Sequence, residues 1–307
     1  MALLRRRNAN RNRVLTYHRF NSAAAETFAD HCEHLRDFYT PVTMDEVAAS
    51  LRDKKPLPRN SVAITIDDGY RDFYLYAYPV LKRTGIPATV YLITDFLDGL
   101  SWPWWDQLSW AFLNTPSDSV ELATGEGGVL RFTLSDVASR TVASAQAGEA
   151  LKLLTNKKRL ELMARLPDLF HVQMPSTAPP SSEPLRWHEV RDMATHGISF
   201  GAHTKRHPVL SSLENEQHIR EEIEGSRDRL TGELGCPPVH FSYPNGQRHD
   251  VSDRIRSLVR EACFQTAVGT ESGFNDIAAD PFFLRRISMD PWAPRLYFRQ
   301  TVAGFRI

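Results

Sequence analysis

Cysteine is scarce in this 307-residue sequence: there are three, Cys32, Cys236 and Cys263, and their spacing forms no motif. So few cysteines exclude a disulfide-rich scaffold and a zinc site built from cysteine ligands. Unpatterned cysteines are also typical of proteins in a reducing compartment. We therefore expect this protein in the cytoplasm.

Net charge and long apolar runs are missing as well. The 37 basic residues balance the 37 acidic ones, so there is no net field to attract nucleic acid, and we expect no nucleic-acid partner. No apolar run has the length of a transmembrane helix. Residues 1–13 are basic and lack the apolar core of a signal peptide. We expect them to form a flexible arm, either free in solvent or touching a membrane surface.

The rest of the sequence alternates between helix and strand patterns. Residues 79–84 have a helix pattern that stops at a glycine, and a strand pattern follows at residues 88–93. Ser211 with Glu214 predicts a capping box at the start of a long charged helix. Such alternation predicts parallel strands with outer helices, and the chain length suits one α/β barrel domain over residues 14–307.

One strand pattern ends in two carboxylates. The β-branched and apolar residues 62–66 are followed at once by Asp67, Asp68 and Gly69, and the glycine permits a sharp turn. In α/β barrels the carboxyl ends of the strands carry the chemistry. Neighbouring strand residues point to opposite sides, so these aspartates should divide the roles of metal ligand and proton acceptor. Alone, the same residues would suit an ordinary turn.

A second strand pattern ends in two histidines. Residues 198–202 precede His203 and His207, which lie four positions apart just before Pro208. Two imidazoles and one carboxylate suit a borderline-soft divalent ion such as Zn²⁺, whereas Mg²⁺ prefers oxygen ligands. Three protein ligands leave a coordination position open, which is typical of a catalytic site.

Three motifs, taken in order, resemble the first three motifs of the polysaccharide deacetylases, the NodB-like carbohydrate esterases. They are Thr65-Ile66-Asp67-Asp68-Gly69, His203-Thr204-Lys205-Arg206-His207 and Tyr243-Pro244-Asn245-Gly246. Val14-Leu15-Thr16-Tyr17-His18-Arg19 and Phe283-Leu284-Arg285-Arg286-Ile287 are similar to the exopolysaccharide branch, which includes poly-N-acetylglucosamine deacetylases. The resemblance covers roughly residues 14–290, apart from about 100–182. It implies a distorted (β/α)7 barrel.

The resemblance also implies roles for the motif residues. The implied ligands of a divalent metal, most simply Zn²⁺, are Asp68, His203 and His207. Asp67 is the implied base for a metal-bound water, and the backbone N–H of Tyr243 is the implied donor to the oxyanion. Tyr243 and Asn245 are expected to contact the glycan substrate.

The sequence departs from the commoner family pattern in two ways. The third motif has no arginine to pair with the base, so we expect Arg286, with Arg285 as the alternative, to pair with Asp67 and keep it ionised. The late histidine that protonates the leaving amine is also missing. His18 matches the early Tyr-His of the exopolysaccharide branch and is the expected acid, with His249 as its rival.

The stretch from about residue 100 to 182 interrupts the helix and strand alternation. It contains a polar helix pattern at residues 152–166, and we expect an inserted, mainly helical lobe. Four tryptophans crowd its start: Trp102, Trp104, Trp105 and Trp110. They either stack on sugar rings, with Trp105 the expected contact, or pack in a core. Asp106 either binds substrate hydroxyls or caps a helix.

Three functions remain open at this stage. The first is a metal-dependent hydrolase that removes N-acetyl groups from an N-acetylhexosamine-containing polysaccharide or its precursor. The second is a hydrolase of another amide, or of an O-acetyl ester, on the same scaffold. The third is a carbohydrate-binding partner without catalysis, but a pure binder has no need of a base beside three metal ligands. The sequence does not indicate an oligomeric state.

Overall fold

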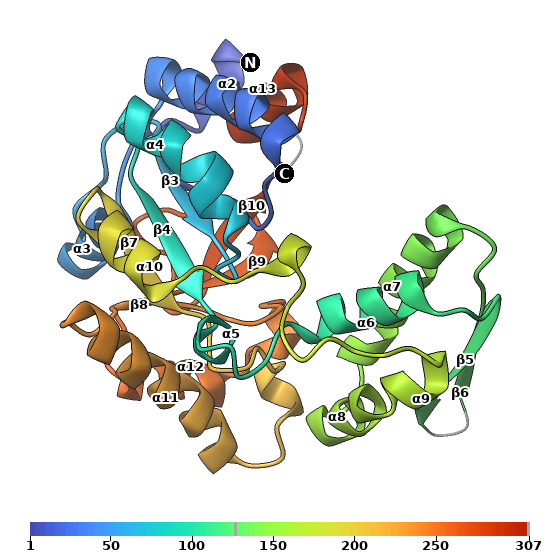
Figure 1. The fold of residues 1–307 in the computed structure, drawn as a ribbon. Coiled ribbons are helices and arrows are strands. Elements are labelled where there is room, and N and C mark those ends of the chain that lie inside the picture. The colour runs from blue at the N-terminus through green and yellow to red at the C-terminus, as the bar shows by residue number, and fades with distance from the viewer. Residues whose placement is uncertain (126–127, 306–307) are drawn as a thin grey trace.

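Seven parallel strands form a closed barrel in the computed structural model, which describes residues 1–125 and 128–305 (Figure 1). Their order around the barrel is β1-β3-β4-β7-β8-β9-β10, and β1 pairs with both β3 and β10. The strands are β1 (Arg13–Tyr17), β3 (Ser61–Ile66), β4 (Ala88–Leu92), β7 (Ile198–Ala202), β8 (His240–Ser242), β9 (Thr266–Ser272) and β10 (Leu284–Ser288). A two-residue strand, β2 (Thr40–Pro41), lies beside β3. The predicted (β/α)7 barrel is confirmed.

Helices cover the outside of the barrel (Figure 1). They are α2 (Ser22–Phe38), α3 (Met44–Asp53), α4 (Tyr78–Thr84), α5 (Thr94–Leu97), α10 (Trp187–Ala194), α11 (Glu216–Leu234), α12 (Asp253–Glu261) and α13 (Arg295–Ala303), with short π or 3-10 turns at Phe73–Ala77, Pro180–Ser182, Leu210–Ser212 and Arg248–Asp250. All six residues of β3 are buried because one face lines the barrel and the other meets these helices. Within the described residues, no helix combines the length and apolarity needed to cross a bilayer.

Helix ends agree with the sequence where a glycine or a side-chain cap fixes them. Helix α4 stops at Gly85, whose φ of 69° is left-handed, as the helix pattern predicted. The predicted capping box at Ser211 is wrong. Helix α11 begins after Asn215, whose side-chain oxygen accepts from the N–H of His218 at 3.0 Å. An asparagine cap closer to the helix therefore takes the place of the predicted serine.

The inserted lobe has its own hydrophobic core and stands to one side of the barrel (Figure 1). It consists of α6 (Trp104–Asn114), β5 (Ser119–Gly125), β6 (Gly128–Thr133), α7 (Val137–Lys152), α8 (Asn156–Ala164) and α9 (Leu166–Phe170). The antiparallel pair β5–β6 was not predicted. The polar helix predicted over residues 152–166 is present as α8 but is shorter, because Thr155 caps its start and separates it from α7.

The N-terminal residues differ from the predicted flexible arm. They form a short helix, α1 (Ala2–Arg7), and then enter β1. Arg13 is fully buried, its Nε donates to the carbonyl of Val302 at 2.8 Å, and its guanidinium lies 5.0 Å from the ring centre of Tyr39. Asn8 donates from its side chain to the carbonyl of Ala303. These contacts hold the N-terminal segment against α13, although its basic composition alone indicated a solvated tail.

A buried histidine joins α2 to α13. His31 has no exposed surface, its ring stacks on Phe298 with the ring centres 3.9 Å apart, and its Nε2 donates to the carbonyl of Ala293. Burial lowers the pKa of His31 to about 4, because the charged imidazolium would lose its hydration there.

The free energy of unfolding should therefore fall as the pH drops. The unfolded chain binds a proton at His31 near pH 6.5 and the folded chain does so only near pH 4, so stability is full above pH 6.5 and declines by up to about 3 kcal/mol down to pH 4. Urea unfolding at pH 7.0, 5.5 and 4.5 measures this slope. His31→Gln should make this slope shallower, with the rest coming from His34, whose pKa burial also lowers to about 4. The same change at the exposed His196 should leave the slope as it is. An equal slope in wild type and His31→Gln contradicts the assignment.

Candidate active site

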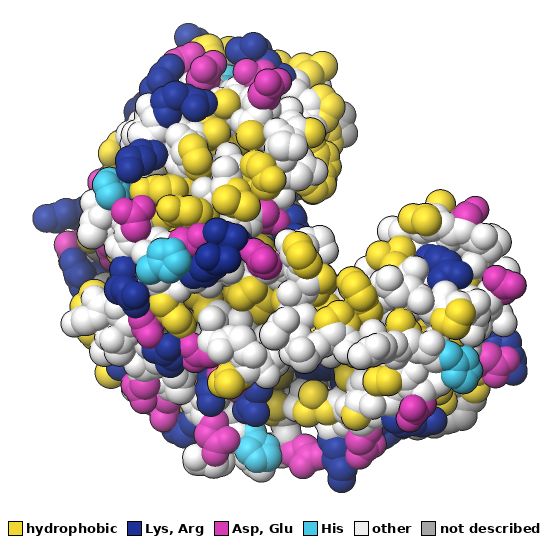
Figure 2. All heavy atoms as spheres, in the orientation of Figure 1, with side chains coloured by type: hydrophobic (Ala, Val, Ile, Leu, Met, Phe, Trp, Pro, Cys, Tyr) yellow, Lys and Arg dark blue, Asp and Glu magenta, His cyan; other side chains and the backbone are white. Residues whose placement is uncertain are grey.

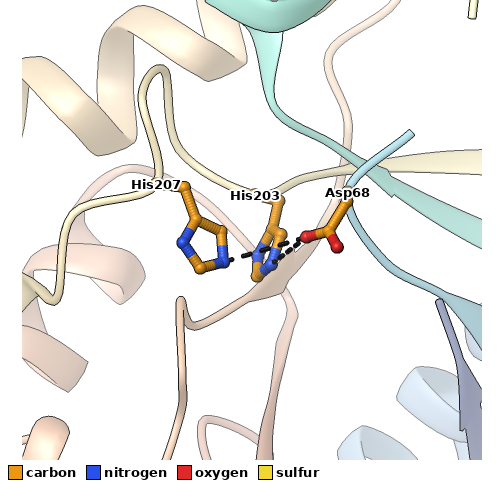
Figure 3. Close-up of side chains that lie close together, drawn as sticks. All are labelled: Asp68, His203 and His207. Carbon is orange, nitrogen blue, oxygen red and sulfur yellow. Dashed lines mark ion pairs between the residues drawn. The ribbon is translucent and has the colours of Figure 1, made fainter. Parts of the chain in front are cut away.

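Two strand ends bring a carboxylate and two imidazoles together (Figure 3). Asp68 follows β3, and His203 and His207 follow β7. The Nε2 atoms of His203 and His207 lie 3.5 Å and 3.8 Å from the same carboxylate oxygen, Oδ1 of Asp68. One ligand atom from each residue lies within 4.8 Å of the other two, and all three residues are buried. The predicted ligand set is thus assembled in one place.

The backbone around this cluster is held in unusual conformations. Asp68, Thr204, His207 and Asn245 all have positive φ, between 57° and 73°, which non-glycine residues rarely adopt. Such strain is kept at sites where the surrounding structure imposes it, and it is typical of functional loops. Gly69 makes the predicted turn at φ 89°, and a Cβ there would lie only 2.7 Å from the Leu92 side chain.

The protonation of the cluster suits a divalent cation. Burial lowers the pKa of His207 to about 3, so this imidazole is neutral. Burial opposes the charge of Asp68, yet the facing His203 holds the pKa of its carboxyl below the ordinary value. Burial opposes the charge of His203, but Asp68 and Asp67 outweigh it and raise the pKa of this imidazole, so a cation at Nε2 would take the place of a proton. The Nδ1 of His203 donates to the carbonyl of Ser242 at 2.7 Å, which leaves Nε2 for a ligand. Two such nitrogens and a carboxylate fit Zn²⁺ in their chemistry.

Asp67 lies beside the cluster but faces a different partner. Two nitrogens of Arg286 donate to its two oxygens at 2.8 Å and 2.6 Å, and Ser242 Oγ donates to Oδ2 at 3.2 Å. Burial raises the pKa of Asp67, but the Arg286 guanidinium outweighs it and keeps the pKa well below its usual range. Arg285 is instead half-exposed and binds Glu271. Of the two arginines that the sequence left open, Arg286 makes the pair.

The two candidate acids lie in different surroundings. His18 follows β1, its Nε2 is 3.8 Å from Oδ2 of Asp67, and its side chain is 44% exposed. It lines the same cavity as the cluster. His249 is 78% exposed, pairs with Asp250 and lies in a neighbouring depression instead. Of the two candidate acids, only His18 therefore lies next to Asp67.

These groups line a cavity of about 850 Å³, which lies in the hollow between barrel and lobe (Figure 2). Tyr243 and Asn245 both line it. The N–H of Tyr243, however, donates to the carbonyl of Val268 at 3.1 Å, and its hydroxyl donates to that of Phe282. The role implied for the Tyr243 N–H is thus contradicted, because strand pairing already uses that donor. Among the described residues the N–H of Asn245 has no acceptor.

The tryptophans at the start of the lobe lie in two kinds of environment. Trp102 and Trp104 are 8% exposed and pack in the cores, although Trp104 also lines the cavity. Trp105 lines the cavity with its ring against His207, the ring centres 4.6 Å apart. Trp105 Nε1 donates to the hydroxyl of Tyr70, which donates to Asp106 at 2.7 Å. Asp106 does not cap α6, whose N-cap is Pro103. It accepts from Tyr70, which holds Trp105 in place. Asp106 also lines the cavity, so its contact with substrate hydroxyls stays a prediction.

Three residues of the site were missed from the sequence. Ser242 holds His203 through its carbonyl and Asp67 through its hydroxyl. Thr16 Oγ1 accepts from Arg286, and Tyr70 links Trp105 to Asp106. Thr16 could have been found, because it lies two positions before His18 and shares its side of the strand.

Comparison with known proteins agrees with this geometry. The family model described as polysaccharide deacetylase matches residues 54–110 and 154–267, more than half of the chain. A putative polysaccharide deacetylase of Bacillus subtilis, YxkH, is 40% identical over 87 residues, which are 26% of this chain and 31% of that protein. The poly-beta-1,6-N-acetyl-D-glucosamine N-deacetylase of Escherichia coli K12 is 32% identical over 81 residues, 26% of this chain and 12% of that protein. The alignments thus span less than a third of each curated relative.

Solved structures share the fold over nearly the whole chain. IcaB from Ammonifex degensii has a TM-score of 0.63 at 18% identity, covering 97% of this chain and 98% of that one. The Streptococcus pyogenes deacetylase PplD has a TM-score of 0.62 at 18% identity, with 96% and 99% covered. Barrel, motif residues and family match agree, and the chain belongs to the polysaccharide deacetylase family.

Proposed function

We propose that this protein is a metal-dependent de-N-acetylase of a polysaccharide, or its precursor, that contains N-acetylhexosamine. One observation carries the proposal: an ionised, arginine-held Asp67 lies beside an aspartate and two histidines in a single cavity. The printed name of the Escherichia coli relative, an N-deacetylase of poly-N-acetylglucosamine, supports this substrate class. The free thiols of Cys236 and Cys263 are exposed, which supports a cytoplasmic location.

The metal would be held by Asp68, His203 and His207, and two nitrogen ligands favour Zn²⁺ over Mg²⁺. A divalent ion bound there would polarise the acetamide carbonyl and increase the acidity of a water molecule. The hydrogen bond from His203 to the carbonyl of Ser242 fixes the ring that presents Nε2.

Asp67 is the general base in this proposal. It accepts the proton of the attacking water through Oδ2, the oxygen that also faces His18. Arg286 keeps the carboxylate ionised at neutral pH and fixes its orientation, since both of its oxygens are held. The N–H of Asn245 donates to the oxyanion as the tetrahedral intermediate forms, because the Tyr243 N–H is already bonded to Val268.

His18 is the general acid and donates its proton to the nitrogen of the leaving amine. Its partial exposure at the cavity wall gives it access to both substrate and solvent. His18→Gln should lower kcat by roughly 10²- to 10⁴-fold on an N-acetylated glycan. The same change at His196, an exposed histidine that lines neither this cavity nor its neighbour, should leave kcat within about twofold of wild type. Equal losses for the two variants contradict the assignment.

Acetate and amine release from N-acetylglucosamine oligomers by the zinc-loaded protein tests the proposal directly. Asp67→Asn serves as the inactive control, because it keeps the shape of the side chain and removes the base. We expect release by wild type and none above background by the control. Zinc binding without release from any N-acetylated glycan contradicts the proposal and favours another amide, an O-acetyl ester or a carbohydrate-binding role.

A further inference from the structure

One wall of the catalytic cavity comes from the stretch that the family model does not match. That model covers residues 54–110 and 154–267, so α7 lies entirely in the unmatched segment between them. The cavity nevertheless has α7 residues in its lining, opposite the metal ligands supplied by the barrel loops. The hollow between lobe and barrel in Figure 2 is the space that these two walls enclose.

The lining residues follow one face of the helix. Thr141, Ser144, Gly148 and Lys152 are spaced by three or four positions, which places them in a row along α7. The eleven helical steps from Thr141 to Lys152 span about 16 Å, longer than one sugar ring. Hydroxyls on this row, and the amide of the neighbouring Gln146, can donate to and accept from sugar hydroxyls.

The cleft continues past the C-terminal end of α7. A second cavity of about 700 Å³ shares Glu149, Lys152, Asn245 and Gln247 with the first. Lys152 Nζ binds Glu149 Oε1 at 2.5 Å, so the two side chains add no net charge where the cavities meet. A neutral chain that extends beyond the reacting sugar fits this shape and charge.

We infer that α7 is a substrate-selecting wall that binds the sugar residues flanking the one that loses its acetyl group. The protein thereby acts within a glycan chain rather than on a single sugar. This inference rests on the proposed function, which supplies the reaction at the metal end of the cleft, and it adds the extended subsite that the lobe provides.

Gly148 offers a direct test, because a Cβ there would have no atom within 4 Å and the residue has an ordinary helical φ. Gly148→Trp should fill the cleft without straining the helix, since glycine is the poorer helix former. Gly232→Trp in α11 is the matched control: it is also a helical glycine with open space around its Cβ, and it is outside both cavities.

Two measurements on these variants test whether α7 binds the flanking sugar residues. The first is the ratio of kcat/KM for an N-acetylglucosamine pentamer to kcat/KM for 4-nitrophenyl acetate, a small acetyl ester. We expect Gly148→Trp to lower this ratio about tenfold and Gly232→Trp to leave it unchanged. The second is calorimetric binding of the pentamer to metal-free protein, which Gly148→Trp should weaken to the same degree.

The outcomes separate this inference from the proposed function. If wild-type protein binds the pentamer but releases no acetate, the proposed function is contradicted. The role of α7 is then tested by comparing pentamer binding between wild type and Gly148→Trp. An unchanged ratio and unchanged binding in Gly148→Trp overturn the role of α7 even if wild type is active. Equal loss of both activities also overturns it, because a separate flanking subsite should spare the small ester relative to the pentamer.

Discussion

His203→Ala is expected to lower acetate release from N-acetylglucosamine oligomers by at least about 10³-fold and to remove bound zinc. The change deletes one of two nitrogens that face Asp68 Oδ1, at 3.5 Å, and a divalent ion supplies several kcal/mol of transition-state stabilisation in such hydrolases. The measurements are initial rates after zinc loading and the zinc content of the purified protein. Calorimetric titration with zinc gives the lost affinity independently of activity.

His196→Ala is the matched control, because this histidine is exposed and pairs only with residues of its own helix end. It should keep both the zinc content and the rate of wild type. Undiminished zinc binding by His203→Ala would show that the ion is held elsewhere. Full activity without zinc would remove the metal from the reaction altogether.

Arg286→Met is expected to lower the free energy of unfolding by about 3–5 kcal/mol. The side chain is buried and gives two hydrogen bonds to Asp67, which is 2% exposed, so the substitution leaves a buried carboxylate without its positively charged partner. Without the guanidinium, burial should raise the pKa of Asp67 and reduce the ionised base at neutral pH. Activity should fall along with stability. Urea unfolding and acetate release at pH 7 measure the two effects.

A double-mutant comparison separates the charge from the packing. Arg286→Met combined with Asp67→Asn should recover part of the lost stability, because no unpaired charge remains, yet it should stay inactive. Arg285→Met, one residue earlier and half-exposed with Glu271, should cost less than about 1 kcal/mol. Equal destabilisation by the two arginine changes would contradict the buried pair.

The flexible N-terminal arm that the sequence suggested illustrates where composition misleads. Arginines at the N-terminus indicate solvent exposure on average, but Arg13 is buried because it finds a carbonyl acceptor on α13 and aromatic rings on both sides. The acceptor, the carbonyl of Val302, lies 289 positions away in the chain. No local pattern can indicate such a contact.

The oxyanion donor is a second feature that the local sequence could not indicate, because it depends on a single hydrogen bond between strands. The motif placed Tyr243 at the end of a strand, where a free N–H was plausible. Pairing of β8 with β9 then decided which N–H groups were used, and that of Tyr243 was taken by Val268. Asn245, two positions later and with positive φ, lies beyond the strand pairing.

By itself, the sequence determined the barrel, the cluster of Asp68 with the two histidines, and the separate position of Asp67. It could do so because strand ends are local signals and a parallel barrel collects them at one rim. The sequence also favoured Arg286 over Arg285 and His18 over His249, but only the tertiary structure decided between them and showed that α7 lines the cleft. These choices depend on side-chain directions and on contacts between segments far apart in the chain, which folding alone brings together.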